Sequence, residues 1–162
     1  MAIFQPVNGI ITRIDDYWTG NASLLGCTKR MTLESQDGNI VNFVVTPATY
    51  FVHHVMVAEG ETVTGFYDAS APALMIYPPQ YQAVVMAREY RHENVKVDYF
   101  NEELVSRDGA LKLNIAPSTR IVLENGQRFT GELPNRYLIV VYGATTRSIP
   151  AQTTPYEIIV MC

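Results

Sequence analysis

The residues of this chain that could carry out metal chemistry are few and lie far apart. Its only cysteines are Cys27 and Cys162, and its only histidines are His53, His54 and His92. A structural zinc site needs four ligands at defined spacing, which these residues do not offer. The adjacent His53 and His54 would also face opposite sides of a strand. We therefore expect no metal and no cofactor.

The two cysteines allow three interpretations. The first, which we favour, is a pair of buried free thiols. The second is a disulfide between Cys27 and Cys162, which would close most of the chain and add about 4–5 kcal/mol in the chain-entropy account. The third is a bridge between chains, because the terminal position of Cys162 would let it reach a neighbour.

Residues 15–21 combine two acids with two aromatic side chains, Tyr17 and Trp18. Rings stack on the apolar faces of sugars while carboxylates accept hydroxyl protons, so this loop is a candidate ligand platform. The simpler alternative is a solvated hairpin tip. A glycosidase would need two carboxylates at a defined separation in a cleft. Neither a Gly-x-Ser-x-Gly elbow nor a Gly-rich phosphate loop is present, so we expect no enzyme.

Two proline-rich elbows form the second candidate region. Proline cannot donate in a strand ladder, so these stretches are expected to be loops or edge segments. Their tyrosines either dock a partner, since rigid aromatic surfaces lose little entropy on binding, or fill the ends of a β-barrel. The candidate interface and ligand residues are Tyr17, Trp18, Tyr77, Pro78, Pro79, Gln80, Tyr81, Arg147 and Tyr156.

These elbows belong to an internal repeat. Tyr67 and Tyr81 lie fourteen positions apart, as do Tyr142 and Tyr156, and an apolar run follows each pair. Upstream, Asp37-Gly38 matches Asp108-Gly109, and Pro47-Ala-Thr49 matches Pro117-Ser-Thr119. The order is the same and the spacing is 71, 70 and 75 residues, which indicates one module used twice.

The elements that must position these residues are strands. Period-two alternation is visible in residues 8–14, 61–67, 95–99 and 111–115. Turn dipeptides lie between them at Asp37-Gly38, Glu59-Gly60, Asp108-Gly109 and Asn125-Gly126. Residues 50–57 are expected to form a strand or at most one helical turn. The sequence predicts an all-β protein of two tandem OB-like small β-barrels related by duplication, with residues 1–90 as the first repeat and 91–162 as the second.

Composition excludes several functions. The net charge of −4 disfavours a nucleic-acid partner. No apolar run approaches the roughly 18 residues of a membrane span, so membrane insertion is not expected. The amino terminus has no classical secretory signal, which leaves the compartment unassigned and the cell or spore surface, reached by a non-classical route, as one location.

Three segments carry a resemblance to a known module. Residues 65–67, 77–81 and 142–150 resemble a module of poorly characterised bacterial proteins, many from anaerobic spore-formers, that closes with a Tyr-x-Pro-x-x-Thr-x-Ser-x-Pro-Pro-Gln phrase and an apolar strand. The second copy fits at Thr146, Ser148, Pro150 and Gln152 but has Ala151 in place of the second proline. The resemblance implies a small β-barrel of envelope or surface proteins with no established chemistry.

Two functions follow as hypotheses. The first is a structural protein that self-associates into a surface or envelope assembly, through β-strand edges, the amino-terminal arm (residues 2–6) and the apolar last strand (residues 158–162). The alternative is an oligosaccharide- or peptide-binding module that uses the aromatic loops. The expected partner is therefore a second copy of the chain, or else a glycan or peptide.

Overall fold

The computed structural model describes all 162 residues as strands and loops with two short 3-10 turns, which confirms the all-β prediction. The chain divides into two compact units, unit 1 (Met1–Glu89) and unit 2 (Tyr90–Cys162). This division lies one residue before the boundary expected from the sequence. The four turn glycines Gly38, Gly60, Gly109 and Gly126 all have positive φ, as their turn dipeptides predicted.

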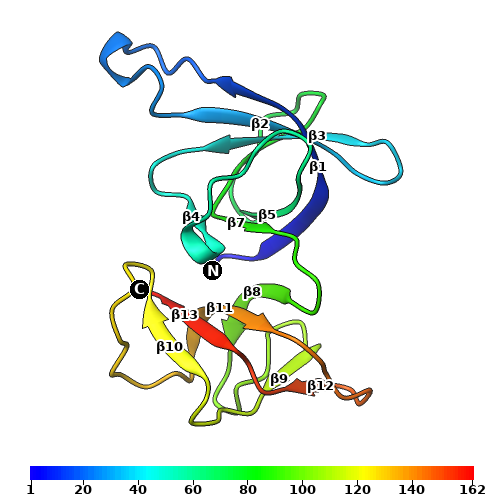
Figure 1. The fold of residues 1–162 in the computed structure, drawn as a ribbon, viewed down its shortest axis with the longest axis vertical. Coiled ribbons are helices and arrows are strands. Elements are labelled where there is room, and N and C mark those ends of the chain that lie inside the picture. The colour runs from blue at the N-terminus through cyan, green and yellow to red at the C-terminus, as the bar shows by residue number, and fades with distance from the viewer. The chain divides into compact units, whose positions relative to one another are not determined.

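Unit 1 contains seven strands in the order β4-β7-β5-β1-β2-β3-β6. Figure 1 labels all of them except β6. They are β1 (Phe4–Asp16), β2 (Lys29–Glu34), β3 (Ile40–Val45), β4 (Tyr50–Phe51), β5 (Thr62–Asp68), β6 (Gln80–Gln82) and β7 (Val85–Arg88), with 3-10 turns η1 (Ala22–Leu24) and η2 (Val52–His54). The pairs β1–β2, β2–β3, β1–β5 and β5–β7 are antiparallel, whereas β3–β6 and β4–β7 are parallel.

Only Ala83 and Val84 separate β6 from β7, and both continue the hydrogen-bonded ladder. The Ala83 amide donates to the Val44 carbonyl at 3.0 Å, and the Val84 amide donates to the Phe66 carbonyl at 2.8 Å. One bent segment therefore joins β3 to β5, and the pairing path β1-β2-β3-β6/β7-β5 returns to β1.

Unit 2 repeats this pairing scheme. Its strands are β8 (Asn94–Phe100), β9 (Leu111–Leu113), β10 (Arg120–Leu123), β11 (Arg136–Tyr142), β12 (Ala151–Thr153) and β13 (Glu157–Met161). The pairs β8–β11 and β11–β13 are antiparallel, and β9–β12 and β10–β13 are parallel, as in the matching pairs of unit 1. The counterpart of β2 is reduced to two isolated bridges, Phe100 with Ser106 and Val105 with Lys112.

Side-chain hydrogen bonds repeat as well. In the turn after β3, the Thr49 hydroxyl donates to the Ala83 carbonyl at 2.8 Å. In the turn after β9, the Thr119 hydroxyl donates to the Pro155 carbonyl at the same distance. The Pro-Ala-Thr and Pro-Ser-Thr segments matched by sequence thus perform the same task in the two units.

The second tyrosine of each elbow does not correspond, contrary to the sequence alignment. Tyr81 pairs with Phe43 of β3, but the residue at the matching position of β12 is Thr153, which pairs with Leu113 of β9. The structural counterpart of Tyr156 is Val84, because the amide of each donates to the matching carbonyl of β11 or β5. The loop before β6 is three residues longer than the loop before β12. Because of these extra residues, equal spacing in the sequence matched Tyr81 with Tyr156 although the two do not correspond in the fold.

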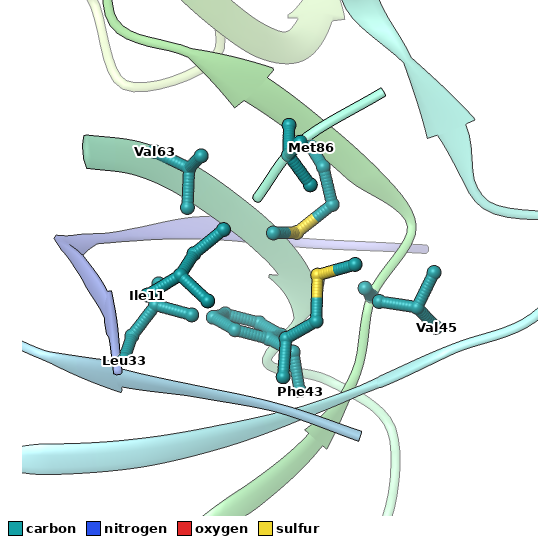
Figure 2. Close-up of a cluster of buried hydrophobic side chains, with 9 residues drawn as sticks. Ile11, Leu33, Phe43, Val45, Val63 and Met86 are labelled. Atoms are coloured by element: carbon teal, nitrogen blue, oxygen red, sulfur yellow. The ribbon is translucent and has the colours of Figure 1, made fainter. Parts of the chain in front are cut away.

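Each unit has its own apolar core. In unit 1, Phe43 lies among Ile11, Leu33, Val63 and Met86 (Figure 2). In unit 2 the core is Phe100, Leu111, Leu113, Leu138, Val140, Ile158 and Val160. Alternate residues of the strands supply these side chains, as period-two patterning requires.

The terminal segments are paired within their own units, the amino-terminal one along one edge and the last strand along both. The ladder between β1 and β5 begins at Phe4 with Asp68, and the Ile3 amide donates to the Asp68 carboxylate at 3.0 Å. The last strand, β13, lies between β10 and β11 and is paired on both edges. Apolar patterning alone does not distinguish such a central strand from an edge strand.

Candidate functional site

Two neighbouring loops of unit 1 contain no charged residue. They are residues 17–28, between β1 and β2, and residues 69–79, between β5 and β6, and the uncharged stretch continues from residue 79 to Val84. The chain as a whole has 12 basic and 16 acidic residues, so a loop surface without charge is unusual here. Depletion of charge with enrichment of aromatic residues and methionine is the compositional signature of protein interfaces.

The longer loop presents an exposed apolar crest, residues 74–77. Leu74, Met75, Ile76 and Tyr77 are between 50% and 101% exposed, and the most exposed is Met75. This loop is three residues longer than its counterpart in unit 2. Large apolar side chains on a monomer surface in contiguous groups mark an interaction site.

Asp68 fixes the start of this loop. Its carboxylate accepts from the Ser70 amide at 2.9 Å and from the Ser70 hydroxyl at 2.6 Å. The Ser70 hydroxyl lowers the pKa of Asp68, and the Ile3 amide acts in the same direction. This carboxylate therefore ties the loop to the amino-terminal segment and remains charged near neutral pH.

Beside the crest lies a hollow of about 340 Å³, the unit 1 groove, lined by residues 67–74 other than Ser70 and by residues 80–84 other than Ala83. Tyr67 and Tyr81 contribute a stacked pair, with ring centroids 3.7 Å apart and an interplanar angle of 6°. Both rings pack against the core at Phe43. Burial, with a hydrogen bond to Tyr81, raises the pKa of Tyr67, so the Tyr67 hydroxyl stays neutral.

The structure brings several predicted residues together here. The Gln80 amide donates to the Tyr17 hydroxyl at 3.2 Å, which joins the two uncharged loops at their bases. Trp18 is exposed on the β1–β2 hairpin, whose tip projects from unit 1 (Figure 1). Tyr77 belongs to the crest and Tyr81 lines the groove.

Pro78 and Pro79 are half-buried, and the Pro79 carbonyl accepts from the Asn42 amide at 2.9 Å. This second proline is thus part of the approach to β6 and is held against β3. The peptide bonds Tyr77–Pro78 and Ile149–Pro150 are both cis. Pro78 and Pro150 each stand two residues before a glutamine, Gln80 in β6 and Gln152 in β12.

Arg147 and Tyr156 belong to unit 2, where a hollow lies at the matching position. It is lined by Asn114, Gly143, Ala144, Thr145, Thr146, Gln152, Thr153, Thr154 and Tyr156. Tyr156 is half-exposed and its hydroxyl donates to the His92 carbonyl at 3.4 Å, whereas Arg147 is exposed outside the lining. The shared location is therefore aromatic and apolar in unit 1 but rich in threonine in unit 2.

Sequence reasoning did not name Leu74, which lies beside Met75 and Ile76 in the crest, as a candidate contact residue. The available signal was the combination of three large apolar residues with an uncharged stretch in a loop bounded by prolines. The pairing of Tyr67 with Tyr81 was not visible either, because it depends on β6 returning beside β5.

The cysteine and histidine predictions require correction. Cys27 and Cys162 are both free and exposed, so the favoured interpretation of buried thiols is wrong, and no disulfide joins them in this structure. His53 and His54 lie at the end of η2 with φ of 65° and 51°, so they do not occupy opposite faces of a strand. No group of three His, Cys, Asp or Glu side chains is arranged to hold a metal ion.

None of the helical segments has the length and hydrophobicity needed to cross a bilayer. Comparison with family models, with curated proteins and with solved structures found no match to this chain.

Proposed function

We propose that this chain is a non-enzymatic structural protein that self-associates, and that it consists of two OB-like barrels derived by duplication. The pairing path β1-β2-β3-β6/β7-β5, with β3 parallel to β6, supports the barrel assignment, because an OB-type barrel is a five-stranded Greek-key sheet closed in this way. The repeated hydrogen bonds of Thr49 and Thr119 support the duplication.

The main support for self-association is the uncharged, apolar surface of unit 1. In an OB-type barrel, the loops after the first and fourth strands border the binding face. Those loops here are residues 17–28 and 69–79, the same loops that lack charge and expose Trp18, Met75 and Tyr77. Association that covers these side chains removes apolar surface from water and is therefore favoured.

Side-chain contacts carry the association in this proposal, in place of the strand addition that the sequence suggested. The outer side of β10 is occupied by residues 127–129, since the Leu123 amide donates to the Gln127 carbonyl at 2.7 Å and the Phe129 amide donates to the Ile121 carbonyl at 3.2 Å. At the end of β8, the Arg107 amide donates to the Tyr99 carbonyl at 2.8 Å. Short or covered edges of this kind discourage pairing with another chain.

Sedimentation velocity over a wide concentration range tests the proposal on the purified chain under reducing conditions. We expect a concentration-dependent oligomer that persists in high salt, since an apolar contact is not screened by ions. A strict monomer at every concentration would refute self-association.

A second candidate function, an oligosaccharide- or peptide-binding module, is favoured by the hollow found at the same position in both units. Trp18 is the only tryptophan and is exposed beside Tyr17, so its fluorescence reports ligand binding to unit 1. Titration with glycans and proline-rich peptides should change this emission; a flat response across both panels would exclude these ligand classes at the unit 1 face.

The surface location implied by the resemblance is part of the same proposal. We infer display on a cell or spore surface by a non-classical route. Protease accessibility of the chain on intact cells or spores measures this directly, and complete protection until lysis would contradict it.

A further inference from the structure

We propose that the contact between copies is reciprocal: the apolar crest of one chain (residues 74–77) inserts into the unit 1 groove of a second copy, whose crest inserts into the groove of the first. This inference rests on the proposed self-association and identifies the surface that mediates it.

The crest and the groove are both formed by residues 67–84. Leu74 is both the first crest residue and part of the groove lining, so the two features are immediate neighbours. A two-fold contact uses the same patch on both subunits and therefore requires a patch that complements itself. A crest beside a groove of matching polarity meets this requirement.

The crest and the groove carry almost no charge. No charged side chain lies between residues 69 and 84, and Asp68 is the single charged residue of the groove lining. The Asp68 carboxylate already accepts from Ile3 and Ser70, so an inserted apolar side chain would not leave it without partners. The chain has a net charge of −4, and contact through an uncharged patch avoids bringing like charges together. An acidic partner would find no basic group in this lining.

The groove is large enough to receive a side chain of the crest. A cavity of about 150 Å³ holds benzene, and the groove of about 340 Å³ thus has room for the Met75 side chain together with part of a neighbour. Methionine adapts to irregular apolar space. At their exposures, the four crest side chains present on the order of 600 Å² per copy, which with the groove walls approaches the roughly 800 Å² per partner of a standard interface.

The test compares Met75→Glu with Ile149→Glu by sedimentation. Met75 and Ile149 are 101% and 96% exposed, and each lies in the loop before the matching short strand of its unit, so neither substitution disturbs a core. A hot-spot residue typically accounts for about 30-fold in affinity, and a two-fold dimer contains it twice, so we expect Met75→Glu to weaken dimerisation roughly 1000-fold. Ile149→Glu should leave it unchanged.

A crosslink then tests the insertion itself. In a Cys27→Ser, Cys162→Ser background, chains with Met75→Cys are mixed with chains carrying Gln82→Cys, since Gln82 is exposed and lines the groove. We expect the mixed disulfide to exceed both homodisulfides. If Met75→Glu still assembles like wild type, or if the mixed disulfide does not form, the inserted crest is refuted while self-association stands. A wild-type chain that stays monomeric refutes the proposed function itself.

Discussion

Gly65 of β5 is the point where the unit 1 core has least room, and Gly65→Ala is our most stringent prediction. A Cβ atom at this position would lie 2.6 and 2.7 Å from two ring carbons of Phe43 and 3.0 Å from the sulfur of Met86. Phe43 and Met86 are both 0% exposed, so neither side chain has free space into which it could move. Gly65 therefore permits the Phe43 ring to cross the centre of unit 1.

The expected cost follows from this geometry. Overpacking by one methyl group typically costs about 1–3 kcal/mol. Replacement of glycine by alanine in a strand returns roughly 0.5–1 kcal/mol by reducing the entropy of the unfolded chain. The difference between these ranges is about 0–2.5 kcal/mol. Because Phe43 and Met86 have no free space, we expect a loss in its upper part, about 1–2.5 kcal/mol, and at about 4–8 °C per kcal/mol for a unit of this size the melting midpoint should fall by roughly 5–20 °C.

A double-mutant cycle with Phe43→Leu isolates the clash. Leucine shortens the side chain at the point of contact, so the double variant should be more stable than the sum of the single effects by about 1 kcal/mol or more. Unfolding is followed by urea titration of Trp18 fluorescence, because the only tryptophan lies in unit 1. If the two single effects on the free energy of unfolding are additive, or if Gly65→Ala leaves it unchanged, the contact between residue 65 and Phe43 does not restrict the packing of the core.

Three further predictions concern other sites. Thr49→Val and Thr119→Val should each cost about 1–3 kcal/mol in chemical denaturation, more for the buried Thr119, because each leaves a carbonyl without its donor; a neutral Thr119→Val would contradict the shared role. The pKa of Asp68 lies below its ordinary value of 3.8, so its contribution to stability is present above that pH and is lost as the pH falls through the lowered pKa. The melting temperature of Asp68→Asn should therefore fall less between pH 5 and pH 2 than that of the wild type. If both fall equally, this carboxylate does not contribute to the loss of stability in acid. Both cysteines are exposed and free, so the native chain under reducing conditions should react with two equivalents of a thiol reagent at rates near those of the unfolded chain; protection of Cys27 that disappears on dilution would place it in the interface between copies.

Local features were predictable because they depend on local chemistry. Asp-Gly and Asn-Gly pairs predicted turns since glycine adopts positive φ without strain, and Gly38 and Gly126 do so at 85° and 86°. Residues 50–57 were expected to form a strand or a single helical turn, and they form β4 followed by η2. The candidate site was predicted in part: Tyr17 and Gln80 were both named, but nothing in the sequence placed one against the other.

The sequence predictions that were wrong concern residues whose position depends on pairing between distant strands. Tyr81 and Tyr156 match by residue type, yet hydrogen-bond register places Thr153 opposite Leu113, where Tyr81 stands opposite Phe43 in unit 1. The apolar end of the chain suggested a free edge, but β13 is paired on both sides. The cysteines were expected inside because free thiols are usually buried, whereas both lie at the surface.

The sequence by itself determined the strand content, the turn positions and the existence of two similar halves, because side-chain alternation and glycine conformation act over a few residues. Only the tertiary structure decided which strands close against each other, and hence that β6 returns beside β5 and stacks Tyr81 on Tyr67. The same closure leaves residues 74–77 with no core to cover them. Their exposure is a property of the fold, since an apolar loop residue and an apolar core residue are identical until the chain is paired.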